Sequence, residues 1–205
     1  MNYGQVRDQI LKLLNQYTRA GTPVDGSYNN QQDYLNRIPD LVNDAMLEIA
    51  TTTRKIPAVL NLEGLYGEEL GENGDVLYEL PSDFYQLISG SVVTTREGKV
   101  LHTNEYTLQG RKYLAVPREE AGNYTFSYYR YPTLLPNNPA DTAQLDNAPE
   151  THFAIPFYVA AMLVIHDDAF LYASFYNKYE DKLAKMGPGI TAEVSPTQDV
   201  YSFFG

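Results

Sequence analysis

The sequence predicts an α+β fold that is mainly α-helical, in which a helical bundle carries an inserted small antiparallel β-sheet and an extended C-terminal tail. Apolar residues recur every three or four positions near both ends of the chain, and short β-branched and aromatic segments fill the middle. After a Gly-Pro-Gly stop at 187–189 the helical period is absent. The expected parts are an N-terminal helical hairpin, an inserted β-rich region, a linker with the closing helices of the same bundle, and the tail, at residues 1–56, 57–135, 136–187 and 188–205.

Two apolar stripes predict the N-terminal hairpin. A loop containing glycine and proline separates them, and each stripe occupies one face of a helix. Because each helix alone would leave its apolar face in water, the two helices are expected to pack against each other. Pro39 must either kink the second helix or lie in the first turn of its main part. The stripes consist of Tyr3, Val6, Ile10, Leu13, Leu14 and Tyr17, and of Tyr34, Ile38, Leu41, Val42, Ala45, Met46 and Ile49.

The middle of the chain predicts an antiparallel meander of four or five strands. Segments rich in β-branched and aromatic residues alternate with turn sequences such as REGK, LQGR and REEAGN. In the last segment Tyr124, Phe126 and Tyr128 alternate with Thr125, Ser127 and Tyr129, so both faces carry aromatic rings and neither face is expected to be freely solvated. The segments lie at 76–80, 85–95, 99–103, 111–116 and 123–132.

The closing helices are interrupted by His166, Asp167 and Asp168. A histidine beside two aspartates is compatible with a metal site or an acid/base centre, and also with a joint between two helices. Consecutive helical residues point about 100° apart, so the three side chains cannot converge on one ion while the helix continues. Asp168 stands where it can cap the helix that follows. We therefore interpret the triplet as a helix junction that binds no metal.

Composition narrows the function classes. The chain has 205 residues, no cysteine, 18 tyrosines, no tryptophan and a net charge of −11. Disulfides and thiolate metal sites are therefore excluded, and the 15 scattered basic residues disfavour tight binding of nucleic acid. The nearly apolar run from Phe153 to Ile165 is too short to cross a bilayer, so no membrane partner is expected. Nucleophile-elbow, dinucleotide and P-loop motifs are missing, so we expect neither an enzyme nor a cofactor.

Two blocks of the sequence resemble a known family. QQDYLNRIPDLVNDAMLEIAT, at 31–51, resembles the second helix of head-to-tail connector (adaptor, head completion) proteins of tailed bacteriophages. AIPFYVAAMLVIHDDAFLYASFYNKYEDKLAKM, at 154–186, is similar to their closing helices, in which a face of small residues is followed by an acidic break and a tyrosine-rich run. These blocks are patterns of helix packing, and the β-rich region carries no matching motif.

The resemblance implies a structural virion protein of the neck, between capsid and tail, that assembles in the cytoplasm of the host bacterium. Copies would form a homo-oligomeric ring, usually of twelve, under the portal protein. The ring would extend the DNA channel, which DNA traverses without specific binding, and would join the next tail or neck component. An acidic channel wall suits this role because it repels phosphate. Because like-charged copies also repel one another, we expect the ring to need the portal or raised salt to close.

Docking residues are expected among the aromatic side chains near the C-terminus. The tail either folds back on its own subunit or reaches a neighbouring subunit or the portal. The candidates are Tyr172, Tyr176 and Tyr179 on the last helix, and Tyr201, Phe203 and Phe204 in the tail.

Two other classes of function stay open at this point. The first is a ligand- or carbohydrate-binding module of a phage tail or cell-surface assembly, in which tyrosines of the sheet would stack on sugar rings. The second is an enzyme with a dispersed carboxylate site, which would require two facing carboxylates in a cleft.

Overall fold

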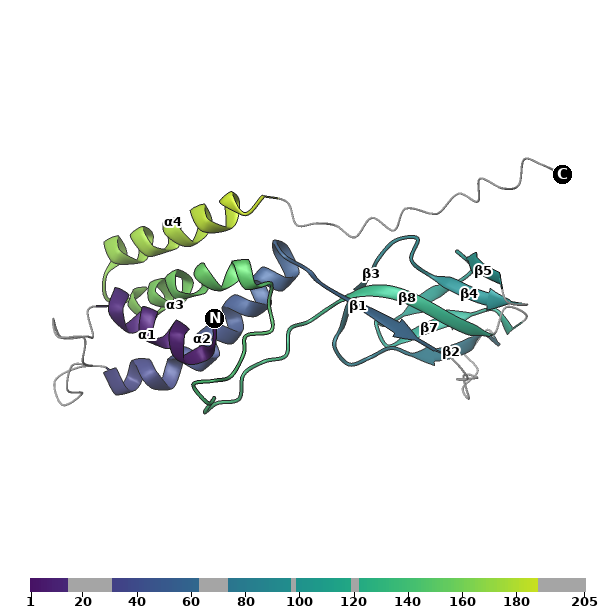
Figure 1. The fold of residues 1–205 in the computed structure, drawn as a ribbon, viewed down its shortest axis with the longest axis horizontal. Coiled ribbons are helices and arrows are strands. Elements are labelled where there is room, and N and C mark those ends of the chain that lie inside the picture. The colour runs from purple at the N-terminus through teal and green to yellow at the C-terminus, as the bar shows by residue number, and fades with distance from the viewer. Residues whose placement is uncertain (15–30, 63–73, 97–98, 119–121, 188–205) are drawn as a thin grey trace. The chain divides into compact units, whose positions relative to one another are not determined.

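The chain folds into two compact units, each with a hydrophobic core of its own (Figure 1). The helical unit consists of Met1–Ile56 and Arg130–Gly189, and the β unit includes Pro57–Tyr129. The structure is a computed structural model. It describes residues 1–14, 31–62, 74–96, 99–118 and 122–187.

The described part of the helical unit contains four α-helices and a short 3₁₀ helix. The first helix begins with a capping box, because the Asn2 side chain accepts from the Gln5 N–H and the Gln5 side chain accepts from the Asn2 N–H. Pro39 lies inside the second helix. The elements are α1 (Tyr3–Leu13), α2 (Gln31–Thr52), η3 (Pro149–Phe153), α3 (Ile155–Val164) and α4 (Ala169–Lys185).

Helix α3 forms the centre of the helical unit. All ten of its residues are apolar, and it packs against α1, α2 and α4. Val159 and Ala160 are completely buried, as are Ile10 of α1 and Met46 of α2. The apolar stripes of the first two helices therefore converge on α3. The expectation that these two helices pack mainly against each other is corrected, because the main partner of each is α3.

The described part of the β unit contains eight strands in two antiparallel sheets. In one sheet the order is β1-β8-β4-β5, with β3 also paired to β8, and in the other it is β2-β7-β6. The strands are β1 (Ile56–Asn61), β2 (Val76–Glu79), β3 (Phe84–Leu87), β4 (Val93–Arg96), β5 (Lys99–His102), β6 (Thr107–Gln109), β7 (Tyr113–Val116) and β8 (Asn123–Arg130).

Aromatic residues of β8 fill the core that the two sheets share. Tyr124 and Phe126 are buried, and the Tyr124 ring meets that of Tyr78, from the other sheet, edge to face at 5.5 Å between centroids. The buried Tyr78 hydroxyl donates to the Gly122 carbonyl at 3.0 Å, which satisfies its polar end. This face of β8 is thus dry because the second sheet covers it.

The predicted fold class, a mainly helical bundle with a small inserted meander, is wrong. The strands build a unit with its own core, and their spatial order is not that of a meander. Two strands were missed for physical reasons. Strand β1 contains Pro57 and has no strong run of β-branched residues, and β6 was interpreted as part of the turn LQGR.

The turn between β6 and β7 has a defined geometry. Gly110 and Arg111 both have φ near +58°, and the Lys112 N–H donates to the Gln109 carbonyl at 3.0 Å. Two consecutive residues with positive φ are typical of the type I′ turns that join hairpin strands tightly. The second position usually holds glycine or asparagine, so the arginine there adopts a backbone conformation that L side chains rarely take.

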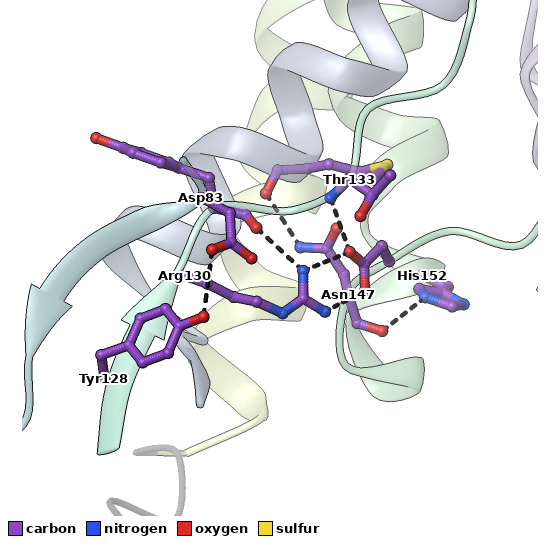
Figure 2. Close-up of polar contacts among 9 residues, drawn as sticks. Asp83, Tyr128, Arg130, Thr133, Asn147 and His152 are labelled. Carbon is purple, nitrogen blue, oxygen red and sulfur yellow. Dashed lines mark hydrogen bonds and ion pairs between the residues drawn. The ribbon is translucent and has the colours of Figure 1, made fainter. Parts of the chain in front are cut away.

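The segment 131–148, here called the return segment, leads from β8 to η3 and is held by side chains rather than by regular structure (Figure 2). The Asp146 carboxylate accepts hydrogen bonds from both terminal guanidinium nitrogens of Arg130, at 2.6 and 2.7 Å. It also accepts one from the Thr133 N–H at 2.7 Å. The Asn147 side chain donates to the Met46 carbonyl at 3.0 Å. These contacts satisfy backbone groups that would otherwise be stranded beside the core.

The same segment is fastened to the first two helices. Both the oxygen and the nitrogen of the Asn43 side-chain amide bond the backbone of Leu135, at 2.8 and 2.9 Å. Asp141 forms an ion pair with Arg7 at 2.6 Å, and its carbonyl accepts the Gly4 N–H at 2.9 Å. A Cβ at position 4 would lie 2.9 Å from the Asp141 Cβ, so this close approach requires glycine.

We expect Asp146→Asn to destabilise the helical unit by about 1 kcal/mol at pH 7, since solvent screens part of this half-exposed ion pair. The hydrogen bond from Arg130 is the largest cause that lowers the pKa of Asp146 from 3.8 to about 2. A depressed carboxyl pKa stabilises the fold above the unfolded value, and this stabilisation is lost as pH falls through about 2. The difference from wild type, measured by urea unfolding, should therefore shrink between pH 5 and pH 2.

A matched control is Asp181→Asn, which removes an exposed i,i+4 pair with Lys185. It should change the free energy of unfolding by less than about 0.5 kcal/mol. Equal effects of the two variants would contradict a special role for Asp146.

Candidate docking surface

The α3–α4 junction is a capped corner between two helices. Helix α3 ends at Val164 and α4 begins at Ala169. The Asp168 Oδ1 accepts the N–H groups of Phe170 and Leu171, at 3.0 and 2.9 Å. These N–H groups have no partner within the helix, so the side chain satisfies them and places its charge at the positive end of α4. The prediction of a helix junction capped by Asp168 is confirmed.

His152 and His102 make their contacts away from the α3–α4 junction. His152 is buried, one ring nitrogen contacts the Asn147 carbonyl at 3.1 Å and the other contacts the N-terminal amino group of Met1 at 2.7 Å. Burial is the main cause that lowers the pKa of His152, which favours the neutral ring that these two contacts require. His166 and Asp167 point into solvent. In the part of the chain that the structure describes, no group of three or more acidic, histidine or cysteine side chains is placed to hold a metal.

Three large apolar side chains are exposed around the capped corner. Phe170 is 80% exposed, Leu171 39% and Ile165 38%. We call these three residues the apolar corner. Phe170 and Leu171 both lie in the first turn of α4, beyond the end of α3, and within the described residues no neighbouring helix covers them. The signal that sequence reasoning missed is the position of a phenylalanine two residues after a capping residue.

The tyrosines predicted as docking residues on α4 differ in exposure. Tyr172 and Tyr176 are half-buried, and their rings stack at 5.6 Å between centroids. Tyr179, which was expected to be exposed, is completely buried. Its ring meets Tyr158 of α3 edge to face at 5.2 Å, and its hydroxyl donates to the Glu48 carboxylate at 3.0 Å. The expectation for Tyr179 is therefore corrected, because α4 turns this position toward α2 and α3.

The environment of these tyrosines is apolar and acidic. Burial first, and then the nearby charges of Glu48 and Asp44, raise the pKa of Tyr158 to about 12, and burial also raises the pKa of Tyr179. Both hydroxyls are therefore protonated donors at neutral pH. They serve to join α3 and α4 to α2 and are not available to a partner. Tyr201, Phe203 and Phe204 lie outside the described residues.

Two of the three tyrosines in the alternating segment of β8 do not support the carbohydrate-binding interpretation. Tyr124 and Tyr128 are buried in the core of the β unit. Tyr128 stacks on Phe84, and its hydroxyl donates to Asp83 at 3.2 Å. A ring in such a position cannot stack on a sugar.

A comparison with known protein families matches residues 1–200 to the family described as SU10 adaptor protein. The chain belongs to this family. Its members are structural adaptors of bacteriophages rather than enzymes, and the protein is accordingly a component of the virion. No curated protein matches the chain significantly. Among the described helices of this adaptor, none has the length and apolar character needed to span a membrane.

We expect Asp168→Ala to cost about 1 kcal/mol of stability, the usual effect of losing an N-cap. Asp167→Ala is the matched control, because it removes an exposed aspartate of the same corner that caps nothing. It should leave the melting temperature within about a degree of wild type. Zinc, calcium or magnesium should shift neither variant nor wild type, and a metal-dependent rise that disappears in His166→Ala would contradict the junction interpretation.

Proposed function

We propose that this adaptor is a head-to-tail connector whose copies form a ring, of twelve by family resemblance, under the portal. The ring extends the DNA channel, joins the next tail or neck component, and lets DNA pass without specific binding. Membership of a phage adaptor family supports the joining role. The net charge of −11 suits a wall that repels phosphate.

The observation that carries this proposal is the apolar corner. Phe170 is the most exposed of the large apolar side chains that the structure describes, and it stands on a backbone fixed by the Asp168 cap. A rigid aromatic anchor surrounded by smaller contacts is typical of the centre of a protein–protein interface. We assign the apolar corner to the contact with the portal, and Tyr172 and Tyr176 extend it along α4.

Burial of the Phe170 ring at the portal would supply about 1.5–3 kcal/mol, which corresponds to about ten- to a hundredfold in affinity. We therefore expect Phe170→Ser to weaken binding to purified portal rings by that factor. Its melting temperature should stay near wild type, since an exposed side chain contributes little to folding. Co-sedimentation with portal rings and negative-stain images of the complexes provide the measurement.

Leu134→Ser is the control, because Leu134 is 54% exposed on the return segment, away from the α3–α4 junction in sequence. It should bind the portal as wild type does. Unchanged portal binding by Phe170→Ser would remove the apolar corner from this contact. A wild-type protein that stays monomeric at every salt concentration and ignores portal rings would contradict the connector function itself.

A further inference from the structure

The three-stranded sheet of the β unit has two adjacent basic residues at one end and a pocket with two carboxylates at the other. At one end, the turn Gly110–Arg111–Lys112, here called the basic turn, joins β6 to β7. At the other end, a pocket of about 350 Å³ is lined by Asp75, Glu105, Tyr106 and Pro117, among others. We call it the acidic pocket.

Strand register places these two features at opposite ends of the same hairpin. Gln109 pairs with Tyr113 beside the basic turn, whereas Thr107 pairs with Ala115, and both of these residues line the acidic pocket. Strand β2 also places Asp75 at the pocket end, because Val76, which follows Asp75, pairs with Val116. Four residues of strand span about 13 Å, so one copy cannot place its own basic turn in its own acidic pocket.

The basic turn is organised before any partner arrives. Its cations both lie over aromatic rings, with the Arg111 guanidinium carbon 6.0 Å from the Tyr85 centroid and the Lys112 ammonium 4.9 Å from the Tyr113 centroid. The Lys112 carbonyl also accepts the Leu80 N–H at 2.8 Å, which ties the turn to β2. Ordered cations lose less entropy on binding than free ones. A guanidinium that stacks on a ring can still donate to a carboxylate with its edge.

The acidic pocket offers the complementary chemistry. Glu105 is exposed, Asp75 is half-buried, and within the described residues neither carboxylate has an ion-pair partner. Tyr106 and Pro117 supply apolar walls against which the stem of a long basic side chain can pack.

We propose that the basic turn of one copy of this chain inserts into the acidic pocket of the next copy, so that Arg111 and Lys112 pair with Asp75 and Glu105 across the interface. Because the two patches differ and lie at opposite ends of one sheet, the contact between two copies is heterologous. Repetition of such a contact closes into a ring when the rotation between copies fits. The inference rests on the proposed ring and names the surface that builds it.

A second copy is favoured over nucleic acid as the occupant. The stretch 57–129 contains about twice as many acidic as basic residues, and this net negative charge disfavours contact with a phosphate backbone. Protein carboxylates held in a pocket on the same chain provide a charge match that needs no other component.

Charge reversal in two separate chains tests the proposal. The turn-reversed variant is Arg111→Glu with Lys112→Glu, and the pocket-reversed variant is Asp75→Lys with Glu105→Lys. Each alone should assemble about a hundredfold less readily than wild type, because like charges then face each other across the interface. An equimolar mixture should regain assembly, because each variant's turn now matches the other's pocket, giving rings in which the two alternate. Ring yield on portal templates is scored by negative stain and light scattering.

The control is Arg37→Glu with Lys185→Glu, which changes the net charge by the same amount as turn reversal but on exposed i,i+4 pairs of the helical unit. It should assemble like wild type. Carbodiimide coupling of the wild-type ring, with copies labelled by two nitrogen isotopes, should join Lys112 to Asp75 or Glu105 between differently labelled copies.

Each outcome decides between the proposals. Rings from the turn-reversed variant alone, or a mixture that fails while both variants keep the wild-type melting temperature, overturn this interface and leave the ring function standing. Reduced DNA retention without any loss of ring assembly would assign the basic turn to DNA and likewise overturn the proposal. Failure of wild type to assemble would contradict the ring and the interface together.

Discussion

The need to cover helix α3, seven of whose ten residues are buried, is the constraint on which the helical unit depends. A helix that is apolar on every side must be covered on every side, and one partner helix can cover only part of it. Helices α1, α2 and α4 therefore cover α3 together. In the sequence, α1 and α2 precede the β unit and α4 follows it. The return segment must then run beside the core with its own polar backbone groups outside any helix or strand. The side chains of Asn43 and Asp146 bind that backbone, and the Asn147 side chain fastens the segment to the Met46 carbonyl of α2, so no regular structure is needed there.

The same constraint explains where the helical unit remains uncovered. Helix α4 has to fold back along α3 within a few residues, and the Asp168 cap lets it start there (Figure 1). At that corner the packing between α3 and α4 ends, so Ile165 and Phe170 are exposed to solvent. Tyr179, farther along α4, is buried. A requirement of folding thus produces a rigid exposed anchor. Large exposed aromatic side chains are costly to solubility unless a partner covers them, which fits an adaptor that functions only within an assembly.

The sequence is sufficient for features that depend on local geometry. The apolar stripes of α1 and α2, the helix junction and the Asp168 cap all follow from spacing along one helix. The structure confirms them within the described residues, which leave out Tyr17. The sequence is insufficient where tertiary neighbours decide. Helical period places Tyr179 and Phe170 on faces of α4, but only the length of α3 determines which of them is covered. Likewise, alternation in β8 shows two aromatic faces but not that a second sheet buries one of them. The acidic pocket joins residues from three separate segments, and strand pairing alone reveals that it lies opposite the basic turn.

Net charge and local charge act over different distances in such an assembly. The repulsion between copies that each carry −11 is a sum over many exposed groups, and it is screened beyond about 8 Å at physiological salt. An ion pair at contact, partly shielded from water by Tyr106 and Pro117, is screened much less. Repulsion therefore opposes random encounters between acidic surfaces, whereas the proposed pairing of basic turn and acidic pocket favours a single register. The repulsion grows with the number of copies brought together, whereas each contact adds only a few ion pairs. A template that holds the copies in place would supply the free energy that the contacts alone do not. In the proposed function, this balance connects the acidity of the chain to assembly on the portal rather than free in solution.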